Sequence, residues 1–232
     1  MGAAIAQRLA AQGCAVALVA RRESELESLA GTIRNAGGTA YTYPHDVCDA
    51  GAVPALFQTV CRDLGGLDAI VYAAGVMPRI AVDEYDFGKD SAMIAVNLLG
   101  AIAWCNEAAA RFAATGAGTI VGIGSVAGDR GRRGQPVYCT SKAALETYLE
   151  ALRNRVGRVG VRVVTIKPGP VDTPMTQGLD KLPLLISAND AAKQIVAAAQ
   201  NGVRVAYVPG AWRVIMGVIR AVPSVVFQKM NI

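Results

Sequence analysis

The sequence contains few of the residues that build metal sites, disulfide frameworks and histidine-dependent hydrolases. His45 is the single histidine among 232 residues, so no histidine cluster for a metal can be assembled. A Ser-His-Asp hydrolase would need this histidine beside its nucleophile, which its place in the chain does not favour. The five cysteines are odd in number and form no Cys-x-x-Cys pair, which argues against a disulfide framework and a structural zinc site. We therefore expect no bound metal and a reducing, cytoplasmic environment.

Charged residues are also scarce, at 18% of the chain, and the basic ones are scattered along it. The net charge of +5 permits contact with an anionic ligand or a membrane surface, but no basic cluster predicts nucleic-acid binding. We expect no signal peptide, because Arg8 interrupts small and helix-forming residues near the start, and no uncharged apolar run is long enough to span a bilayer. These features predict a cytoplasmic protein, peripheral to a membrane at most, that binds no nucleic acid.

Apolar residues make up 53% of the chain and fall into short runs of strand length that alternate with longer helical patterns. This alternation predicts parallel βαβ units, and nearly continuous apolar runs are typical of a sheet covered by helices on both faces. The expected fold class is therefore α/β, with a doubly wound, Rossmann-like parallel sheet in a single domain over residues 1–232. The predicted strands are 15–20, 39–43, 68–73, 119–124, 161–167 and 203–208.

The start of the chain breaks this alternation, because residues 2–12 are predicted to form a helix with no strand before it. In a doubly wound sheet the first strand is central, and the glycine-rich loop after it places a dinucleotide pyrophosphate at the N-terminus of the next helix. Only the last glycine of such a loop is present, as Gly2. We expect a sheet that lacks its first strand and phosphate loop. A truncated or misassigned start explains this better than evolved loss, because unpaired strand edges inside a sheet are costly.

Three residues predict a site for proton transfer. Tyr138 and Lys142 are four residues apart in a segment predicted to be helical from about Gln135, so they share one helix face. A cation close to a phenol favours the phenolate and lowers the pKa of the phenol. Ser125 ends a predicted strand at the carboxyl edge, where such sheets bind ligands, and its hydroxyl can hold a carbonyl oxygen beside Tyr138. The alternatives are a solvated helix face and an ordinary turn serine.

Glycines surround Ser125 and imitate a dinucleotide-binding fingerprint. Their spacing is G-x-G-x-x-x-G, however, and no acidic partner for a ribose follows at the usual distance. We therefore reject that interpretation of the glycines.

At these positions the sequence resembles the short-chain dehydrogenase/reductase family, over essentially the whole chain. The resemblance implies a nicotinamide-dependent oxidoreductase that interconverts a ketone and a secondary alcohol. It implies a catalytic tetrad in which Tyr138 is the general acid in reduction, Ser125 polarises the carbonyl, and Lys142 tunes the phenol and holds the ribose. Asn97 would support a water-linked proton relay, although it could equally be a helix residue satisfied by backbone groups.

The resemblance also implies where the cofactor lies. Asp46 and Val47 match the adenine-contacting pair of the family, and Gly2 would lie at the pyrophosphate. After the strand at 15–20 no carboxylate is available for the ribose 2′-hydroxyl, whereas Arg21 and Arg22 could clamp a 2′-phosphate. NADP is therefore favoured over NAD, with two solvated arginines as the alternative.

Two further segments match the family's cofactor site. At residues 72–75 the family usually has Asn-Asn-Ala-Gly. This sequence keeps Ala74 and Gly75 but has Tyr72 and Ala73 in place of the two asparagines. This difference puts the bracing between strands in doubt. The resemblance places the Pro-Gly segment after the strand at 161–167 beside the nicotinamide carboxamide, through Pro168, Gly169, Val171 and Thr173.

The segments around the predicted site hold clues to the substrate. Residues 170–188 are expected to form a substrate loop. The loop between Ser125 and Tyr138 must pass close to the substrate, and its arginines predict an anionic substrate, with a solubilising loop paired to Asp129 as the alternative. The three arginines are Arg130, Arg132 and Arg133.

The segment 211–232 is rich in apolar residues with basic residues between them, and Pro223 is expected to split it into two short helices. It could lie in a membrane interface, bind an apolar substrate, or pack against the core or a partner subunit. The first of these would place the protein at the inner face of the membrane.

Within the family, the sequence looks most like the decaprenylphosphoryl-2-keto-erythro-pentose reductases, which reduce a keto sugar carried on a polyprenyl phosphate. General ketone reductases and 3-ketoacyl reductases are the alternatives. A catalytically silent binding or scaffold protein is an alternative of another class, because the cofactor loop is missing. The resemblance also implies a homodimer or homotetramer that associates through the helices carrying Asn97 and Tyr138.

Overall fold

The computed structural model describes residues 1–179 and 182–230. All six predicted strands are present within two residues of their predicted ends, and each pairs in parallel with its neighbours. They are β1 (Val16–Ala20), β2 (Ala40–Pro44), β3 (Ala69–Tyr72), β4 (Gly118–Ile123), β5 (Val161–Pro168) and β8 (Val205–Val208).

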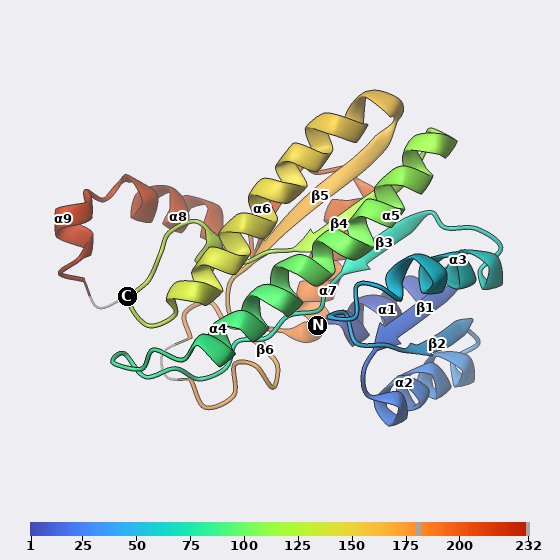
Figure 1. Ribbon diagram of the computed structural model, residues 1–232, viewed down its shortest axis with the longest axis horizontal. Helices are drawn as coiled ribbons and strands as arrows, with labels where there is room; N and C mark the ends of the chain where they lie inside the picture. The colour runs from blue at the N-terminus through green and yellow to red at the C-terminus, as the bar shows by residue number, and fades with distance from the viewer. Residues whose placement is uncertain (180–181, 231–232) are drawn as a thin grey trace.

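Helices cover both faces of the strands, so the doubly wound α/β class is confirmed (Figure 1). Successive residues of β4 point to opposite faces, as the pleat of a strand requires. Ile120 packs with Trp104 and Leu149 on one face, and Val121 packs with Ile5 and Ile195 on the other. The helices that connect the strands are α1 (Gly2–Ala10), α2 (Glu23–Asn35), α3 (Val53–Asp63), α4 (Phe87–Ile94), α5 (Gly100–Thr115), α6 (Pro136–Val156) and α7 (Ala188–Gln200).

The parallel strands form two separate sheets. β1 pairs with β2, whereas the other sheet has the order β3-β4-β5-β8. Among the described residues no strand pairs with the second edge of β1 or with the outer edge of β3. Both edges therefore present backbone N–H and C=O groups without a ladder partner. The division falls at the position where the chain was predicted to lack a central strand.

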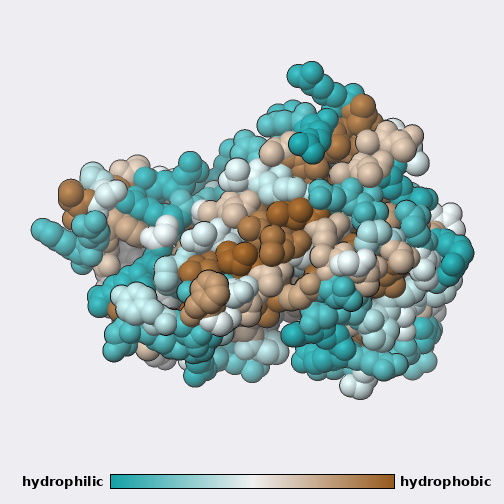
Figure 2. All heavy atoms as spheres, viewed as in Figure 1, coloured by the Kyte–Doolittle hydropathy of each residue, from teal (hydrophilic) through white to brown (hydrophobic). Residues whose placement is uncertain are grey.

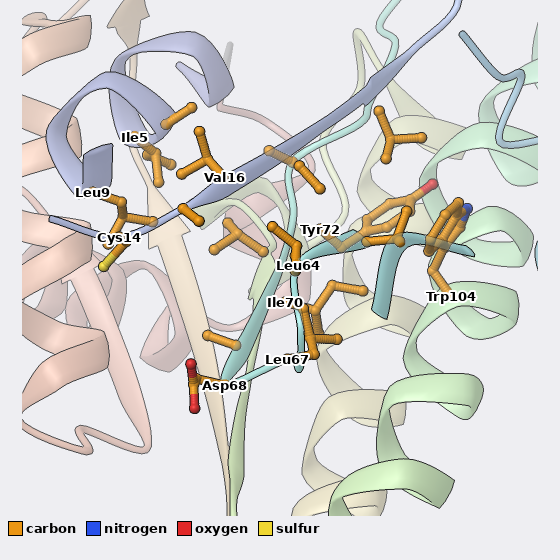
Figure 3. A pocket seen from close by; sticks show the side chains of 18 of the residues that line it. Ile5, Leu9, Cys14, Val16, Leu64, Leu67, Asp68, Ile70, Tyr72 and Trp104 are labelled. Atoms are coloured by element: carbon orange, nitrogen blue, oxygen red, sulfur yellow. The ribbon is translucent and has the colours of Figure 1, made fainter. Parts of the chain in front are cut away.

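A slot of 540 Å³ lies between these two edges, and Figure 3 shows its lining. The side chains come from α1, β1, β3, the end of α3 and α5, and almost all of them are apolar. The labelled members are Ile5, Leu9, Cys14, Val16, Leu64, Leu67, Asp68, Ile70, Tyr72 and Trp104. We call this cavity the inter-sheet slot.

The longest helical segment contains a π-helical turn. This turn, η1 (Ala95–Leu99), joins α4 to α5 without a break. By length and composition the segment Phe87–Thr115 could cross a membrane, but 44% of its most apolar window is buried. Trp104 and Phe112 of α5 lie in the main core cluster, so this segment is a core helix of the fold.

A short pair of strands was not predicted. β6 (Val171–Asp172) pairs in parallel with β7 (Ile186–Ser187), and the two bracket most of the predicted substrate loop 170–188. Residues 180 and 181 of that loop lie outside the described residues.

The C-terminal segment forms two short helices, α8 (Trp212–Ala221) and α9 (Ser224–Phe227), which are separated at Pro223 as predicted. Trp212 and Met216 of α8 are buried against Val126, whereas Val214 and Val218 are exposed on another side of the helix. Residues 231 and 232 of the predicted segment 211–232 lie outside the described residues.

Candidate active site

The structure brings the predicted proton-transfer residues together at the carboxyl edge of β4. Ser125 follows the end of β4, and Tyr138 and Lys142 lie on the first two turns of α6. Pro136 at the start of α6 suits a position whose N–H would have no partner in the helix. All three side chains are buried, at 9%, 7% and 4% exposure, so the site is shielded from bulk water.

Tyr138 and Ser125 form the centre of this site. Burial raises the pKa of Tyr138, while the hydrogen bond with the Ser125 side chain and the positive charge of Arg132 work in the opposite direction. The phenol is therefore protonated at neutral pH and can act as a proton donor. The Ser125 hydroxyl also accepts the backbone N–H of Ala127 at 3.1 Å, which fixes its orientation.

Lys142 lies behind Tyr138, with its Nζ 5.8 Å from the centre of the phenol ring. Burial lowers the pKa of Lys142 to about 8, although the nearby carboxylate of Glu146 raises it. Nζ donates to the carbonyl of Ile123 at 2.9 Å. An ammonium group has three donors, so two remain for other acceptors at this edge of the sheet.

Asn97 is buried in the π-helical turn η1, and its amide holds two segments together. Its Oδ1 accepts the N–H of Val76 at 2.7 Å, and its Nδ2 donates to the carbonyl of Val76 and to Oγ of Ser141, both at 3.0 Å. The side chain therefore ties the segment after β3 to α6. Its two bonds to Val76 are those expected of a helix residue whose amide is satisfied by backbone groups, and its third bond goes to the Ser141 side chain.

Tyr72 replaces the bracing that the missing asparagines put in doubt. Its hydroxyl donates to the carbonyl of Val96 at 2.6 Å, which joins the end of β3 to the π-helical turn. The turn that carries Asn97 is thus anchored from two sides.

The predicted adenine corner is assembled at the carboxyl ends of β1 and β2. Arg21 follows β1, and its guanidinium is 3.8 Å from the carboxylate of Asp46, with 64% of the Arg21 side chain exposed. Arg22 pairs with Glu25 of its own helix at 2.7 Å. Val47 packs against the main core cluster beside α5.

Gly75 lies where a cofactor could pass close to Asn97 and Lys142. A Cβ at this position would be 3.4 Å from Oδ1 of Asn97 and 3.5 Å from Nζ of Lys142. Ala74 packs beside it against the main core cluster. Gly2 begins α1, and a Cβ at Gly2 would be 3.4 Å from Cβ of Ala73.

The predicted nicotinamide segment follows β5. Pro168 ends β5, and Gly169 is covered by the indole of Trp212. Val171 is buried in β6, and its carbonyl accepts the Thr173 hydroxyl at 3.2 Å. The segment is therefore held in place by α8 on one side and by its own turn on the other.

The three arginines of the loop after Ser125 have different surroundings. Arg130 donates to the carbonyls of Ile219 and Val222 at 2.7 and 2.6 Å, and its guanidinium lies 4.0 Å from the ring centre of Phe227. Arg132 is close enough to Tyr138 to influence its pKa, and its buried Nε has no hydrogen-bond partner among the described residues. Arg133 is exposed. Arg132 is thus the arginine nearest to the proposed chemistry, and Arg130 holds the C-terminal helices.

The structure adds residues that the sequence interpretation missed. Glu146 accepts the backbone N–H of Ser125 at 3.0 Å and pairs with Lys167 at 2.8 Å. Its spacing of four from Lys142 and eight from Tyr138 could have placed it on the same helix face. Ser141, the partner of Asn97, had no such signal, because its contact joins residues that are far apart in sequence. No group of three or more potential metal ligands occurs among the described residues.

Comparison with known proteins identifies the family. A family model described as short chain dehydrogenase matches residues 1–182. An uncharacterised oxidoreductase of Mycobacterium tuberculosis is 31% identical over 231 residues, which are 99% of this chain and 92% of that protein. The short-chain reductase NovJ of Streptomyces niveus is 38% identical over 181 residues, covering 77% of this chain and 68% of NovJ.

Solved structures agree with this relationship. A short-chain dehydrogenase/reductase variant from Serratia marcescens is 28% identical, with a TM-score of 0.79 over 91% of this chain and 92% of that one. A short-chain dehydrogenase from Sphingobium yanoikuyae in complex with NADPH has the same fold, with a TM-score of 0.83, 22% identity, and coverage of 96% of this chain and 92% of that one. From its sequence, its fold and its relatives, the chain belongs to the short-chain dehydrogenase family of oxidoreductases.

Proposed function

We propose that the protein reduces a ketone to a secondary alcohol, with Tyr138 as the proton donor. The observation that carries this proposal is the buried pair of Tyr138 and Ser125, which places a phenol and a hydroxyl at the same edge of the sheet. Ser125 would donate a hydrogen bond to the carbonyl oxygen, and Tyr138 would transfer its proton to that oxygen. A bound nicotinamide dinucleotide supplies the hydride that adds to the carbonyl carbon.

The residues near Gly75 fit the nicotinamide end of such a cofactor. Lys142 has donors left over after its bond to Ile123, and a Cβ at Gly75 would lie close to Nζ of Lys142. We propose that Lys142 holds the ribose hydroxyls and keeps a positive charge near Tyr138. Asn97 would support a water-linked proton relay by fixing the segment at Val76 against α6.

The test of the reaction is turnover by the purified chain with a carbonyl substrate and NADPH or NADH. Tyr138→Phe removes the transferable proton and keeps the ring, so we expect its turnover to fall at least about a hundredfold, at the low end of what a general acid contributes. Tyr148→Phe, a change on the same helix outside the site, is the matched control. A Tyr138→Phe variant with undiminished turnover would sink the proposal.

We propose that NADPH is preferred over NADH. Arg21 is largely exposed and has only a long contact with Asp46, so its guanidinium is available to a 2′-phosphate. The related Sphingobium enzyme is described in complex with NADPH. Arg21→Asp should reverse the ratio of kcat/KM for NADPH over NADH. An unchanged ratio would exclude Arg21 from this role.

The pyrophosphate part of the cofactor site fits less well. In a doubly wound sheet that part is formed by the turn between a central strand and the next helix. In this structure the inter-sheet slot separates β1 from β3, and Gly2 stands at the start of α1. We propose that strong dinucleotide binding needs an extended apolar segment in the slot. Comparing the NADPH affinity of this chain with that of an N-terminally extended version tests this directly.

For the substrate, we propose a carbonyl compound that carries a negative charge. Arg132 lies near Tyr138 with a buried Nε that has no partner among the described residues, so an anionic group of the substrate would satisfy it. A lipid-linked keto sugar with a phosphate meets this requirement, and general ketone or 3-ketoacyl reductases are the alternatives. Incubation with NADPH and a polyprenyl-phosphoryl keto-pentose distinguishes them. Turnover of simple ketones or ketoacyl thioesters alone would reject the lipid-linked substrate.

A lipid-linked substrate would bring the protein to a membrane. The exposed Val214 and Val218 lie one turn apart on α8, and Val225 follows on α9. The same helix carries two basic residues, Arg213 and Arg220. We propose a peripheral contact with an anionic membrane surface through this segment. Sedimentation with vesicles that contain acidic lipids, and loss of binding on Val218→Asp, would support it, and equal recovery of both proteins in the supernatant would reject it.

We also propose that the chain forms a homodimer or homotetramer. Apolar side chains gather over the region of α4 and α5 in Figure 2, where Phe87 and Leu99 are 84% and 54% exposed. A second copy of the chain would cover this face. A mass measurement in solution with Leu99→Asp as the variant tests the assembly.

A protein that binds without catalysis is the alternative of another class. The observation that favours it is the division of the parallel strands into two sheets with a cavity between them. A chain that binds no nicotinamide nucleotide, with or without the N-terminal extension, would support this alternative.

A further inference from the structure

A buried carboxylate lies directly behind Ser125. Glu146 of α6 is 8% exposed, and its Oε1 accepts the backbone N–H of Ser125 at 3.0 Å. Its other oxygen is 2.8 Å from Nζ of Lys167, which enters from β5. A carboxylate is rarely buried unless it is paired in this way.

The glycines on either side of Ser125 make room for this carboxylate. A Cβ at Gly124 would be 2.5 Å from Oε1 of Glu146, and a Cβ at Gly128 would be 2.7 Å from both carboxylate oxygens. Any side chain at either position would push the carboxylate out of the turn. Gly124 and Gly128, two of the three glycines that imitate a dinucleotide fingerprint, are therefore explained by the approach of the Glu146 side chain.

The pairing extends away from the site through a chain of charged groups. Lys167 also binds Oδ1 of Asp129 at 2.5 Å, and the other oxygen of Asp129 accepts the hydroxyl of Tyr207 from β8 at 2.8 Å. The side chains of Lys167, Asp129 and Glu146 are 13%, 2% and 9% exposed. Two carboxylates thus share one ammonium group in a nearly dry environment, where hydrogen bonds and charge pairs hold their geometry firmly.

The bond to Glu146 fixes the backbone of Ser125. Ser125 has an extended backbone, with φ of −170° and ψ of 153°, and its N–H points to Glu146. Its hydroxyl lies close enough to Tyr138 to lower the pKa of the phenol. Tyr138, Lys142 and Glu146 follow one another at intervals of four residues on α6. One rigid helix therefore carries the phenol and the carboxylate that holds the serine, so the distance between phenol and hydroxyl depends on both contacts.

We propose that Glu146, held by Lys167 and Asp129, is a positioning residue that sets the Ser125 hydroxyl against Tyr138 for the carbonyl reaction. The inference rests on the proposed function for its kinetic consequence. Glu146 acts through the backbone of Ser125 and touches neither the carbonyl nor the cofactor. The effect on catalysis should appear in kcat, because a misplaced hydroxyl stabilises the transition state less while the bound ground state changes little.

The experiment compares Glu146→Ala and Glu146→Gln in the full chain, alone and combined with Ser125→Ala. Misplacement of a catalytic group by about 1 Å can cost on the order of a hundredfold in rate, so Glu146→Ala should lower kcat by about that factor with KM nearly unchanged. The amide of Glu146→Gln still offers an oxygen to the Ser125 N–H and should recover most of the loss. Glu150→Ala, an exposed carboxylate one turn further along α6, is the matched control.

The combined variants decide whether Glu146 acts through Ser125. If it does, Glu146→Ala lowers kcat no further once Ser125 is alanine, since there is no hydroxyl left to position. Losses that multiply in the double variant would overturn the inference, as would a Glu146→Gln variant as impaired as Glu146→Ala.

A second readout does not depend on any activity. Hydrogen exchange of the Ser125 amide should be slow in the unchanged protein and in Glu146→Gln, and faster by at least about tenfold in Glu146→Ala, while the core strand β5 keeps its protection. Unchanged exchange at Ser125 would overturn the positioning role. If exchange changes as expected and no carbonyl compound is reduced, the proposed function fails while the hydrogen bond itself is upheld.

Discussion

At the scale of single residues, the site depends on groups whose ionisation is changed by burial. Tyr138 and Lys142 occupy successive turns of one helix, and burial moves their pKa values in opposite directions, upward for the phenol and downward for the ammonium. A protonated phenol can donate its proton to a carbonyl, and the weakly held proton of the neighbouring lysine suits the later reprotonation of the phenol. The same burial has a cost in stability.

Lys142→Met should raise the stability of the fold at neutral pH. Burial lowers the pKa of Lys142 from 10.5 to about 8, which corresponds to about 3 kcal/mol against the folded state while the lysine is charged in both states. Loss of the bond to Ile123 offsets about 1 kcal/mol of the gain. We expect a net increase of about 2 kcal/mol in the free energy of unfolding at pH 7, measured by urea denaturation, together with loss of turnover.

The difference in stability between Lys142→Met and the unchanged protein depends on pH. Between pH 8 and 10.5 the folded state has released the proton of Lys142 while the unfolded state still holds it, so the stability of the unchanged protein rises with pH in this window. The advantage of Lys142→Met should therefore shrink as pH rises through it. Lys193→Met, on the exposed face of α7, is the control. An advantage that stays constant from pH 7 to pH 10 would contradict burial as the cause.

At the scale of elements, the C-terminal helices are attached to the loop that leaves Ser125. Arg130 binds the carbonyls at the end of α8 and lies against Phe227 of α9. Cations are favourable at a helix C-terminus, and here the guanidinium also binds carbonyls of the last turn and of the C-cap residue Val222. The loop and the two helices should therefore lose their order together.

Arg130→Ala should loosen α8 and α9 without unfolding the sheet. Removing two short charged hydrogen bonds, each contributing about 1.5–3 kcal/mol, should raise hydrogen exchange over residues 212–227 by at least about tenfold while β4 and β5 keep their protection. Arg133→Ala, in the same loop but exposed, should leave exchange unchanged. Faster hydrogen exchange over residues 212–227 in Arg130→Ala would show that Arg130 stabilises the C-terminal helices. An Arg130→Ala variant with unchanged exchange and a higher KM for an anionic substrate would instead show that Arg130 binds the substrate.

Tyr72→Phe tests the brace between β3 and the π-helical turn. The hydroxyl of Tyr72 donates to the Val96 carbonyl at 2.6 Å, so Tyr72→Phe removes a partly buried hydrogen bond. We expect a loss of about 1–2 kcal/mol in the free energy of unfolding, measured by denaturant titration. Tyr41→Phe, at a more exposed position in β2, is the control and should cost little. A Tyr72→Phe variant as stable as the unchanged protein would show that the turn does not need the brace.

The elements and the central residues could be predicted because they follow local rules. Alternation of strand-length and helical patterns placed all six long strands, and the spacing of four placed Tyr138 and Lys142 on one face. Glu146 follows the same spacing but was missed, because a glutamate on a helix is usually solvated. Its burial depends on Lys167, which lies on β5 and is distant in sequence. Arg130 was assigned to a substrate for a similar reason, since its partners at Ile219 and Val222 lie about 90 residues away in the chain.

At the scale of the whole molecule, the inter-sheet slot separates the predicted adenine corner from the proposed proton-transfer site. Arg21 and Asp46 belong to the β1-β2 sheet, and Ser125 and Tyr138 belong to the larger one. A cofactor that spans both would need the two sheets to keep a constant distance. Within the described residues the contact between them runs through α1 and the apolar lining of the slot, without a continuous ladder of hydrogen bonds.

Filling the slot with a strand should therefore strengthen both sheets at once. The slot is lined by apolar side chains of β1 and β3, and each of these strands has one edge without a strand partner among the described residues, so an added strand would have a partner on both sides. An N-terminal extension that adds a short run of valine and isoleucine and a glycine turn before Gly2 should protect the amides of β1 and β3 from exchange by at least about tenfold and raise the midpoint of thermal unfolding. An extension of equal length with aspartate at alternate positions is the control, because charges cannot enter the apolar lining without a large cost. Equal exchange at β1 and β3 in both extended proteins would mean that the slot does not accept a strand.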